Sequence, residues 1–301
     1  MHSWQSYVLL FIFRMKRLLI DRSGELNVEK DRRELEAMAK WFKPLTPIEC
    51  IPIVANNVPA EWITPGGIST ERVILYIHGG SFNSGSINSH RPLAANIALA
   101  CKARALIIDY RLAPEHHFPS PLEDSLAAYE WLLAAGIPAE HIAVMGDSAG
   151  GTLTLALLIQ LRDQGKSLPA LAVCLSPATD FSMWGESWTL NKRKDFMLNQ
   201  RNIRNSMKIY LRNADPRLPL VSPLYADLLG LPPIFIQVGS VEVLLSDATR
   251  FTEKAKEAGV SVSLEVWNGM QHVWQYTASF LPEARQAIRK IGEYAKNIWG
   301  E

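Results

Sequence analysis

The sequence predicts an α/β fold: a mostly parallel eight-stranded sheet with helices on both faces and a helical cap. Eight short apolar, β-rich runs carry this prediction, and helix-like segments of ten or more residues separate the later runs. Strands that alternate with such helices form parallel sheets through right-handed crossovers. The runs cover residues 48–54, 60–64, 72–77, 103–109, 141–145, 170–175, 233–238 and 261–267.

Helix-like segments with apolar residues at helical spacing separate these runs from residue 91 onward. They span residues 91–101, 121–135, 150–164, 246–259 and 282–299. The first runs have no helix between them, so we expect an antiparallel edge there. Parallel strands joined by helices are buried on both faces, so the helices should cover both sides of the sheet.

The alternation breaks over residues 181–225, which are rich in tryptophan, methionine and charged side chains. We interpret this stretch as a helical insertion. Because ligands of such sheets bind at the carboxyl ends of the strands, an insertion after a strand would roof the binding site. Residues 1–45 are expected to add cap helices, including a surface helix over 25–40, and residues 46–301 to form the α/β domain that carries the insertion.

The apolar run of residues 7–13 is followed by Arg14, Lys16 and Arg17. A secretory signal has positive charges before the apolar run and a small-residue cleavage site after it, and this segment has neither. Seven residues are also too few to span a bilayer. We therefore expect a helix packed on the protein's own apolar surface, without stable membrane insertion. Contact with a membrane interface is the alternative.

Composition favours a globular protein with a small-molecule ligand. The chain has 301 residues, of which 48% are hydrophobic, and a formal net charge of +1. Its charges are evenly spread, so no nucleic-acid surface is indicated. The cysteines, Cys50, Cys101 and Cys174, are expected to be apolar core or near-core residues. They are far apart and include no C-x-x-C pair, which argues against a disulfide framework or a zinc site and is consistent with the cytoplasm. The oligomeric state stays open, a homodimer included.

The hexapeptide GDSAGG, residues 146–151, lies where a strand-like run passes into a helix-like segment. A serine between two glycines at such a turn is typical of the nucleophile of α/β hydrolases, because a side chain at either glycine would collide with the strand or the helix. Ser148 is therefore the candidate nucleophile, and an ordinary N-cap serine is the alternative. The helix that begins at Ala149 presents free backbone N–H groups to a negative charge.

The run of residues 72–77 leads into the loop HGGSFNSG, residues 78–85. Such a loop can point successive backbone N–H groups at one position and is typical of oxyanion holes. A phosphate-binding loop is the alternative, but neither a Gly-Lys-Ser/Thr sequence nor G-x-G-x-x-G spacing is present. His78 stands at the end of the strand, where we expect it to hold the loop rather than act as a base.

Two carboxylates follow the run of residues 233–238, Glu242 and Asp247. Glu242 lies in the loop directly after the strand, whereas Asp247 is typical of the first turn of the next helix, so Glu242 is the favoured acid and Asp247 the alternative. His272 is the candidate base, because of the seven histidines it alone lies on a loop after the last strand and after the acid. The order Ser148, acid, histidine is that of α/β hydrolases.

Taken together, these motifs resemble those of the bacterial hormone-sensitive lipase-like esterases, a branch of the α/β hydrolases. The resemblance covers most of residues 72–272. It implies a serine esterase without metal or other cofactor, which acts on small-molecule esters of short to medium acyl chains. The matching motifs are HGGS at 78–81, DYRLAPEH at 109–116, GDSAGG at 146–151, EVLL at 242–245, and His272.

The resemblance also assigns the oxyanion hole to Gly79, Gly80, Ser81 and Ala149, with N–H groups donated by the last three. Ser81 replaces the third glycine of the family motif H-G-G-G, which leaves a backbone donor in place but puts a side chain where φ > 0 favours glycine. Glu242 replaces the family's usual aspartate and keeps a carboxylate that can orient an imidazole.

Three residues of the second motif are expected to be scaffold: Tyr110, Arg111 and Glu115. We expect a buried pair of Arg111 with Glu115 to fix the loop beneath the oxyanion hole.

The predicted function is a carboxylesterase with a Ser148–His272–Glu242 triad and an acyl-enzyme intermediate. Alternatives are a non-catalytic small-molecule receptor on the same fold, an amidase or peptidase, and a long-chain lipase.

Overall fold

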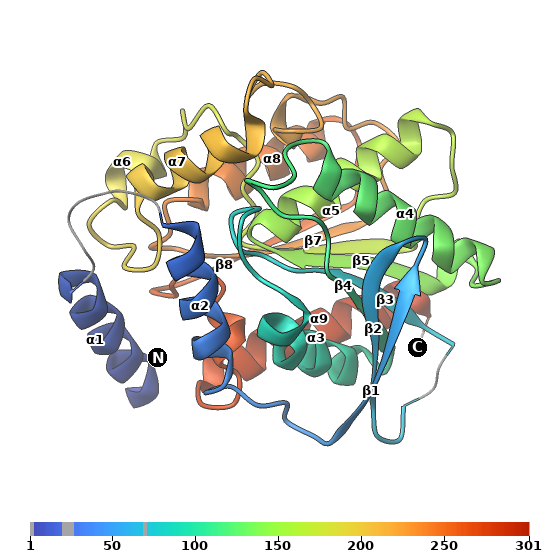
Figure 1. Ribbon diagram of the computed structural model, residues 1–301, viewed down its shortest axis with the longest axis horizontal. Coiled ribbons are helices and arrows are strands. Elements are labelled where there is room, and N and C mark those ends of the chain that lie inside the picture. The colour runs from blue at the N-terminus through green and yellow to red at the C-terminus, as the bar shows by residue number, and fades with distance from the viewer. Residues whose placement is uncertain (1–2, 20–26, 69–70, 301) are drawn as a thin grey trace.

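A single eight-stranded sheet organises the chain, in the order β1-β2-β4-β3-β5-β6-β7-β8 (Figure 1). The computed structural model describes residues 3–19, 27–68 and 71–300. β2 runs antiparallel to both of its neighbours, and all other neighbouring strands are parallel. This confirms the predicted sheet with its antiparallel edge. The strands are β1 (Ile48–Ala55), β2 (Val58–Pro65), β3 (Val73–Ile77), β4 (Arg104–Ile108), β5 (Ile142–Asp147), β6 (Leu171–Leu175), β7 (Ile234–Gly239) and β8 (Val262–Trp267).

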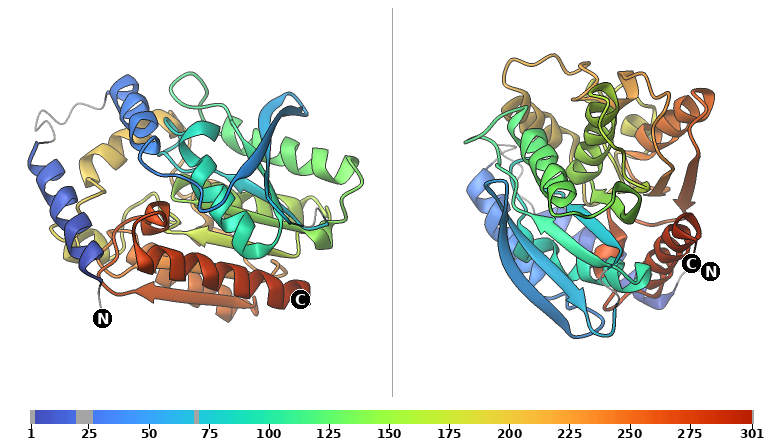
Figure 2. Two further views of the ribbon diagram at one scale, coloured as in Figure 1. Left: turned by 90° about the horizontal axis from the view of Figure 1, so that it is seen from below. Right: turned by 90° about the vertical axis from the view of Figure 1, so that its right-hand side faces the viewer.

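Helices cover both faces of this sheet, as predicted. Seen from below in Figure 2, α3 and α9 lie together on one face. Helices α4, α5 and α8 cover the other face. The helices are α1 (Trp4–Leu19), α2 (Val28–Ala39), α3 (Ile87–Cys101), α4 (Ser120–Ala134), α5 (Ala149–Asp163), α6 (Ser187–Leu190), α7 (Gln200–Leu211), α8 (Leu245–Glu257) and α9 (Pro282–Trp299). Short 3-10 turns span Ala139–His141, Pro223–Tyr225 and Trp274–Thr277.

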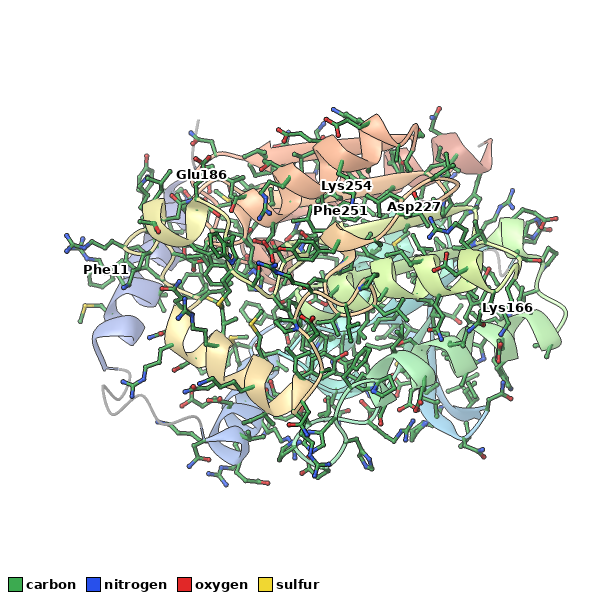
Figure 3. All side chains as sticks on the ribbon, turned by 90° about the horizontal axis from the view of Figure 1, so that it is seen from above. Phe11, Lys166, Glu186, Asp227, Phe251 and Lys254 are labelled. Carbon is green, nitrogen blue, oxygen red and sulfur yellow. The ribbon has the colours of Figure 1, made fainter. Side chains whose placement is uncertain are left out.

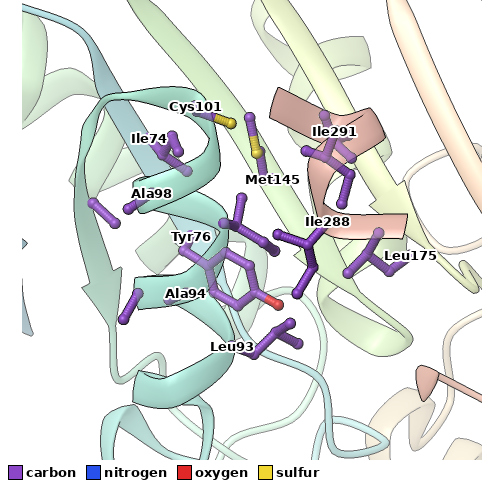
Figure 4. Packing of buried hydrophobic residues seen from close by; sticks show 14 of the residues in the cluster. Ile74, Tyr76, Leu93, Ala94, Ala98, Cys101, Met145, Leu175, Ile288 and Ile291 are labelled. Carbon is purple, nitrogen blue, oxygen red and sulfur yellow. The ribbon is translucent and has the colours of Figure 1, made fainter. Parts of the chain in front are cut away.

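The central strands β3 and β6 are apolar along their whole length because both of their faces are covered. Every residue of β3 and β6 is buried. Figure 4 shows Tyr76 of β3 between Leu93 of α3 and Ile288 of α9, while Ile74 lies beside Ala98 and Cys101 of α3. This packing fixes the carboxyl ends of the strands, where the candidate site lies.

Helices α1, α2, α6 and α7 lie at one end of the molecule (Figures 1 and 2). The insertion predicted over 181–225 contains α6, α7 and a 3-10 turn, with loops between them. The surface helix expected over 25–40 is α2, which Asn27 caps by accepting the N–H of Lys30 at 2.9 Å. Residues 25 and 26 lie outside the described residues. The division into a 1–45 cap and a 46–301 catalytic domain stays a prediction.

The N-terminal apolar run forms part of α1. Leu9 packs against the core that contains α3 and α9, while Phe11 lies on the outer side of the helix with 63% of its surface exposed (Figure 3). Ser3 anchors the start of the helix, since its N–H and hydroxyl donate to Glu283 at 2.6 and 2.7 Å. Within the described ranges, no helix is long and apolar enough to cross a membrane.

The three cysteines are free thiols: Cys101 and Cys174 are buried and Cys50 is half-buried. This agrees with the expectation of apolar core or near-core residues.

Candidate active site

Ser148 stands at the sharp turn between β5 and α5. Its backbone has φ 50° and ψ −118°, a conformation that residues other than glycine rarely adopt, and its N–H donates to Leu175 O at 2.8 Å. The turn needs both flanking glycines. A Cβ at Gly150 would collide with the carbonyl oxygen of Ile77, and one at Gly146 would collide with the Gly150 carbonyl. The sequence motif therefore reflects a steric requirement, and the turn presents the Ser148 side chain at the carboxyl edge of the sheet.

The structure brings the three candidate triad residues together. The Ser148 hydroxyl donates to His272 Nε2 at 2.9 Å, and His272 Nδ1 donates to Glu242 Oε2 at 2.8 Å. Glu242 is fully buried and His272 is 9% exposed, whereas Ser148 is half-buried. Loops after β5, β7 and β8 supply the three residues, as the parallel sheet requires.

The alternative acid, Asp247, is occupied elsewhere. Its carboxylate accepts the backbone N–H groups of Thr179 and Asp180, each at 3.0 Å, and the indole N–H of Trp188 at 3.2 Å. Burial raises its pKa to about 7. Asp247 thus anchors the start of the insertion to α8, while Glu242 is the carboxylate bonded to His272.

The second oxygen of Glu242, Oε1, accepts two further donors. Ser176 donates its hydroxyl at 2.7 Å and Gly239 its backbone N–H at 2.5 Å. Sequence reasoning did not single out Ser176. Its position directly after a buried strand, at the edge where the candidate residues gather, is the signal that could have found it.

The candidate base has an environment suited to proton transfer. Burial alone would lower the pKa of His272, but the hydrogen bond and the charge of Glu242, with smaller contributions from Asp195 and Asp147, raise the pKa above the ordinary 6.5. A stronger base accepts the Ser148 proton more readily, as long as it is neutral.

The loop after β3 contains strained backbone. Gly80 has φ 121° and Ser81 has φ 55°, so serine occupies the left-handed region that favours glycine. The N–H of Gly79, which is not among the expected oxyanion donors, donates to Asp147 Oδ1 at 3.1 Å. The carboxylate of Asp147 lies beside this loop. Gly79 therefore holds the loop against the turn at Ser148.

His78 holds the loop after β3, as expected. It is fully buried, and burial together with the neighbouring His90 lowers its pKa to about 3. Its neutral ring donates from Nδ1 to Gly79 O at 2.7 Å and stacks on Tyr110 at 4.2 Å. The Tyr110 hydroxyl donates to His78 O at 2.9 Å, so Tyr110 supports the loop from beneath.

The expected pair of Arg111 with Glu115 is wrong. Arg111 is 43% exposed and bonds to Asp124 of α4, with Nη2 and Oδ1 at 2.8 Å. Glu115 instead pairs with Arg32 of α2 through two bonds of 2.7 and 2.8 Å. Asp124 also accepts the backbone N–H of Arg111 at 2.8 Å. Arg111 therefore bonds to α4 through both its backbone and its side chain, and not to Glu115 of the loop.

Two pockets adjoin the candidate site. The smaller pocket, of about 30 Å³, lies at Ser148, and its lining is mostly apolar: Ser81, Phe82, Ser148, Ala149, Ala178, Phe181, Leu198, Ile203, Ser206, Met207 and Leu244. The larger, of about 190 Å³, lies beside His272 and is lined in part by Leu9, Leu10 and Phe13 of α1. The cap thus contributes to both pockets. Among the described residues, no group of His, Cys, Asp or Glu is placed to hold a metal ion.

Comparison with known proteins identifies the chain's relatives. A family described as alpha/beta hydrolase fold matches residues 74–276. The acetyl-hydrolase of Streptomyces hygroscopicus is 43% identical over 83% of this chain and 83% of its own length. An esterase of Acinetobacter venetianus is 35% identical over 98% of this chain and 97% of its own length.

Solved structures agree with these relatives. The crystal structure of an esterase from the bacterial hormone-sensitive lipase family is 44% identical to this chain. It superposes with a TM-score of 0.94 over all of both chains. The chain therefore belongs to the α/β-hydrolase family, within its bacterial hormone-sensitive lipase-like branch, and is a carboxylic ester hydrolase.

Proposed function

We propose that Ser148, His272 and Glu242 form the catalytic triad of this esterase. Glu242 orients His272 and stabilises the imidazolium, His272 takes the proton of Ser148, and Ser148 Oγ attacks the ester carbonyl carbon. The imidazolium then protonates the departing alcohol, and water releases the acyl group by the same sequence of proton transfers. The observation that carries this proposal is the continuous hydrogen-bond chain from Glu242 through His272 to Ser148.

The oxyanion of the tetrahedral intermediate is assigned to the backbone N–H groups of Gly80, Ser81 and Ala149. Ala149 is the first residue of α5, where N–H groups have no intrahelical acceptor. In the described part of the chain, no acceptor pairs with the N–H of Gly80 or Ser81. Such pre-arranged donors are among the largest contributions to acyl-transfer catalysis.

Short to medium acyl chains are the proposed substrates. The pocket at Ser148 is small, and the side chains of Phe181, Ile203 and Met207 contribute to its lining. The name acetyl-hydrolase, carried by the Streptomyces relative, supports a short acyl group. A long acyl chain would require these insertion side chains to move.

Initial rates on nitrophenyl esters from acetate to palmitate test this proposal. We expect kcat/KM to be highest for short or medium chains and at least about tenfold lower for palmitate. Ser148→Ala should abolish hydrolysis of every ester, whereas the matched variant Ser167→Ala, at an exposed serine, should not change it. A maximum at palmitate would favour the lipase, faster cleavage of an anilide than of its ester would favour the amidase, and no turnover of any ester would favour the receptor.

A further inference from the structure

The insertion contains a short segment that reaches the loop carrying Glu242. We call residues 191–196 the brace. Asn191, which is 4% exposed, donates from Nδ2 to Ser240 O at 3.1 Å and to Glu242 O at 2.9 Å. Asp195, which is fully buried, accepts the backbone N–H of Val243 through Oδ2 at 3.0 Å. Three side-chain bonds thus hold the backbone on both sides of the candidate acid.

The same brace also holds the residue beside the candidate base. Gln271 immediately precedes His272 and is 6% exposed. Its Oε1 accepts the N–H of Phe196 at 2.8 Å, and its Nε2 donates to Lys194 O at 3.0 Å. A side-chain amide that uses both ends on one backbone segment fixes that segment in position and in direction.

Hydrogen bonds within the brace, and to the two residues that follow it, hold its backbone in shape. Asp195 Oδ1 accepts the N–H groups of Met197 and Leu198, each at 2.9 Å. The backbone N–H groups of Lys194 and Asp195 donate to Asn191 O at 2.8 and 2.9 Å. These bonds tie the position of Asn191 to that of Asp195.

We propose that Asn191, Asp195 and Gln271 are positioning residues that lock the acid loop and the base loop to each other through the insertion. This inference rests on the proposed triad. Glu242 and His272 come from loops after different strands, so their 2.8 Å bond depends on the relative position of the two loops. The brace bonds to both loops at once. A misplacement of about 1 Å in an active site can cost about 100-fold in rate.

Asp195 also affects the base electrostatically. The charged groups that act on His272 are Glu242, Asp195 and Asp147, and the Ser148 hydroxyl faces its Nε2. The charge of Asp195 contributes to the raised pKa of His272. Removing that charge should therefore move the acid limb of the kcat/KM profile to lower pH, which a purely structural role would not do.

The test compares three variants of the full chain by steady-state kinetics on nitrophenyl butyrate. In Asp195→Asn, the remaining oxygen can still accept the N–H groups of Met197 and Leu198, but the new amide N–H meets the Val243 N–H and that bond is lost. We expect kcat to fall about 10- to 100-fold with little change in KM, and the acid limb to move to lower pH. Gln271→Ala should lower kcat to a similar extent and move the acid limb less than Asp195→Asn does, because it loosens the His272–Glu242 bond but removes no charge.

Asp215→Asn is the matched control, since Asp215 is an exposed carboxylate of the same insertion whose side chain caps Arg217 N at 2.8 Å. It should retain wild-type kcat and pH profile. Rates are expressed per folded molecule, with the folded fraction measured by thermal unfolding. If Asp195→Asn and Gln271→Ala match the control in kcat per folded molecule, the inference is overturned. An active Ser148→Ala would instead overturn the proposed triad.

Discussion

Replacing Glu242 by Gln tests how the acid controls the base. One oxygen of Glu242 accepts two donors, Ser176 and Gly239, and the other accepts the N–H of His272. A glutamine has one accepting end and one donating end. If its oxygen keeps the two donors, its amide N–H groups face His272 Nδ1. The imidazole must then carry its proton on Nε2, where it can no longer accept the proton of Ser148.

The expected loss of kcat follows from the hydrogen-bond donors that the glutamine leaves without an acceptor. If the glutamine amide turns the other way, its oxygen accepts the N–H of His272, but a buried donor on the opposite side loses its acceptor. This costs about 1–3 kcal/mol. Only about 1–15% of the molecules would then hold a productive imidazole, because 1.36 kcal/mol corresponds to about tenfold. The variant also lacks the negative charge that stabilises the imidazolium. A comparable acid-to-amide change in a serine protease triad costs about 10⁴ in kcat, and we expect a loss of that order here.

The assay is kcat and KM on nitrophenyl butyrate, with Glu253→Gln as the matched control at an exposed glutamate of α8. Glu242→Gln should leave KM nearly unchanged, because the acid does not touch the substrate. A Glu242→Gln variant whose kcat stays within about tenfold of wild type would refute the reasoning. The cost of turning the glutamine amide alone lowers kcat by more than tenfold over most of the range of about 1–3 kcal/mol.

Three further predictions concern the pH profile, the turn and the oxyanion loop. The kcat/KM profile should lose activity as pH falls through a pKa above 6.5, because Glu242 raises the pKa of His272 and the protonated ring cannot act as a base; a midpoint at or below 6.5 would contradict this. Gly150→Ala should abolish activity and lower thermal stability, because its Cβ collides with Ile77 O; near-normal rates and melting temperature would count against the steric argument. Ser81→Gly should stabilise the fold by about 0.5–1 kcal/mol in denaturant unfolding, since removing a left-handed strain of about 1–2 kcal/mol outweighs the added entropy of the unfolded chain; a loss of stability would show that the serine side chain contributes more than its strain costs.

Much of the fold could be predicted because local sequence patterns determine it. The strands and α9 were located to within a few residues, since apolar runs and helical periodicity mark buried strands and amphipathic helices directly. Helix α3 begins at Ile87 rather than residue 91, because Ser86 and Ser89 form a capping box that the helical pattern did not reveal. Local signals of this kind decide where an element begins, not whether it exists.

The candidate site could be predicted where its residues directly follow strands of the sheet. Ser148, Glu242 and His272 each follow a strand, and parallel strands bring such positions to one edge. Contacts that depend on side-chain geometry across the cap were not predictable. Arg32 on α2 pairs with Glu115, which is 83 residues away in sequence. Phe196 of the brace bonds to Gln271, which is 75 residues away. No local pattern marks such partners.

Covalent labelling with a fluorophosphonate tests the central claim most directly. Intact-mass and peptide mass spectrometry should show a single adduct per chain, located on Ser148, and esterase activity should fall in proportion to its formation. Ser148→Ala should form no adduct. An adduct on another serine that abolishes activity, or full activity in protein labelled at Ser148, would contradict the proposed role of Ser148 as the nucleophile.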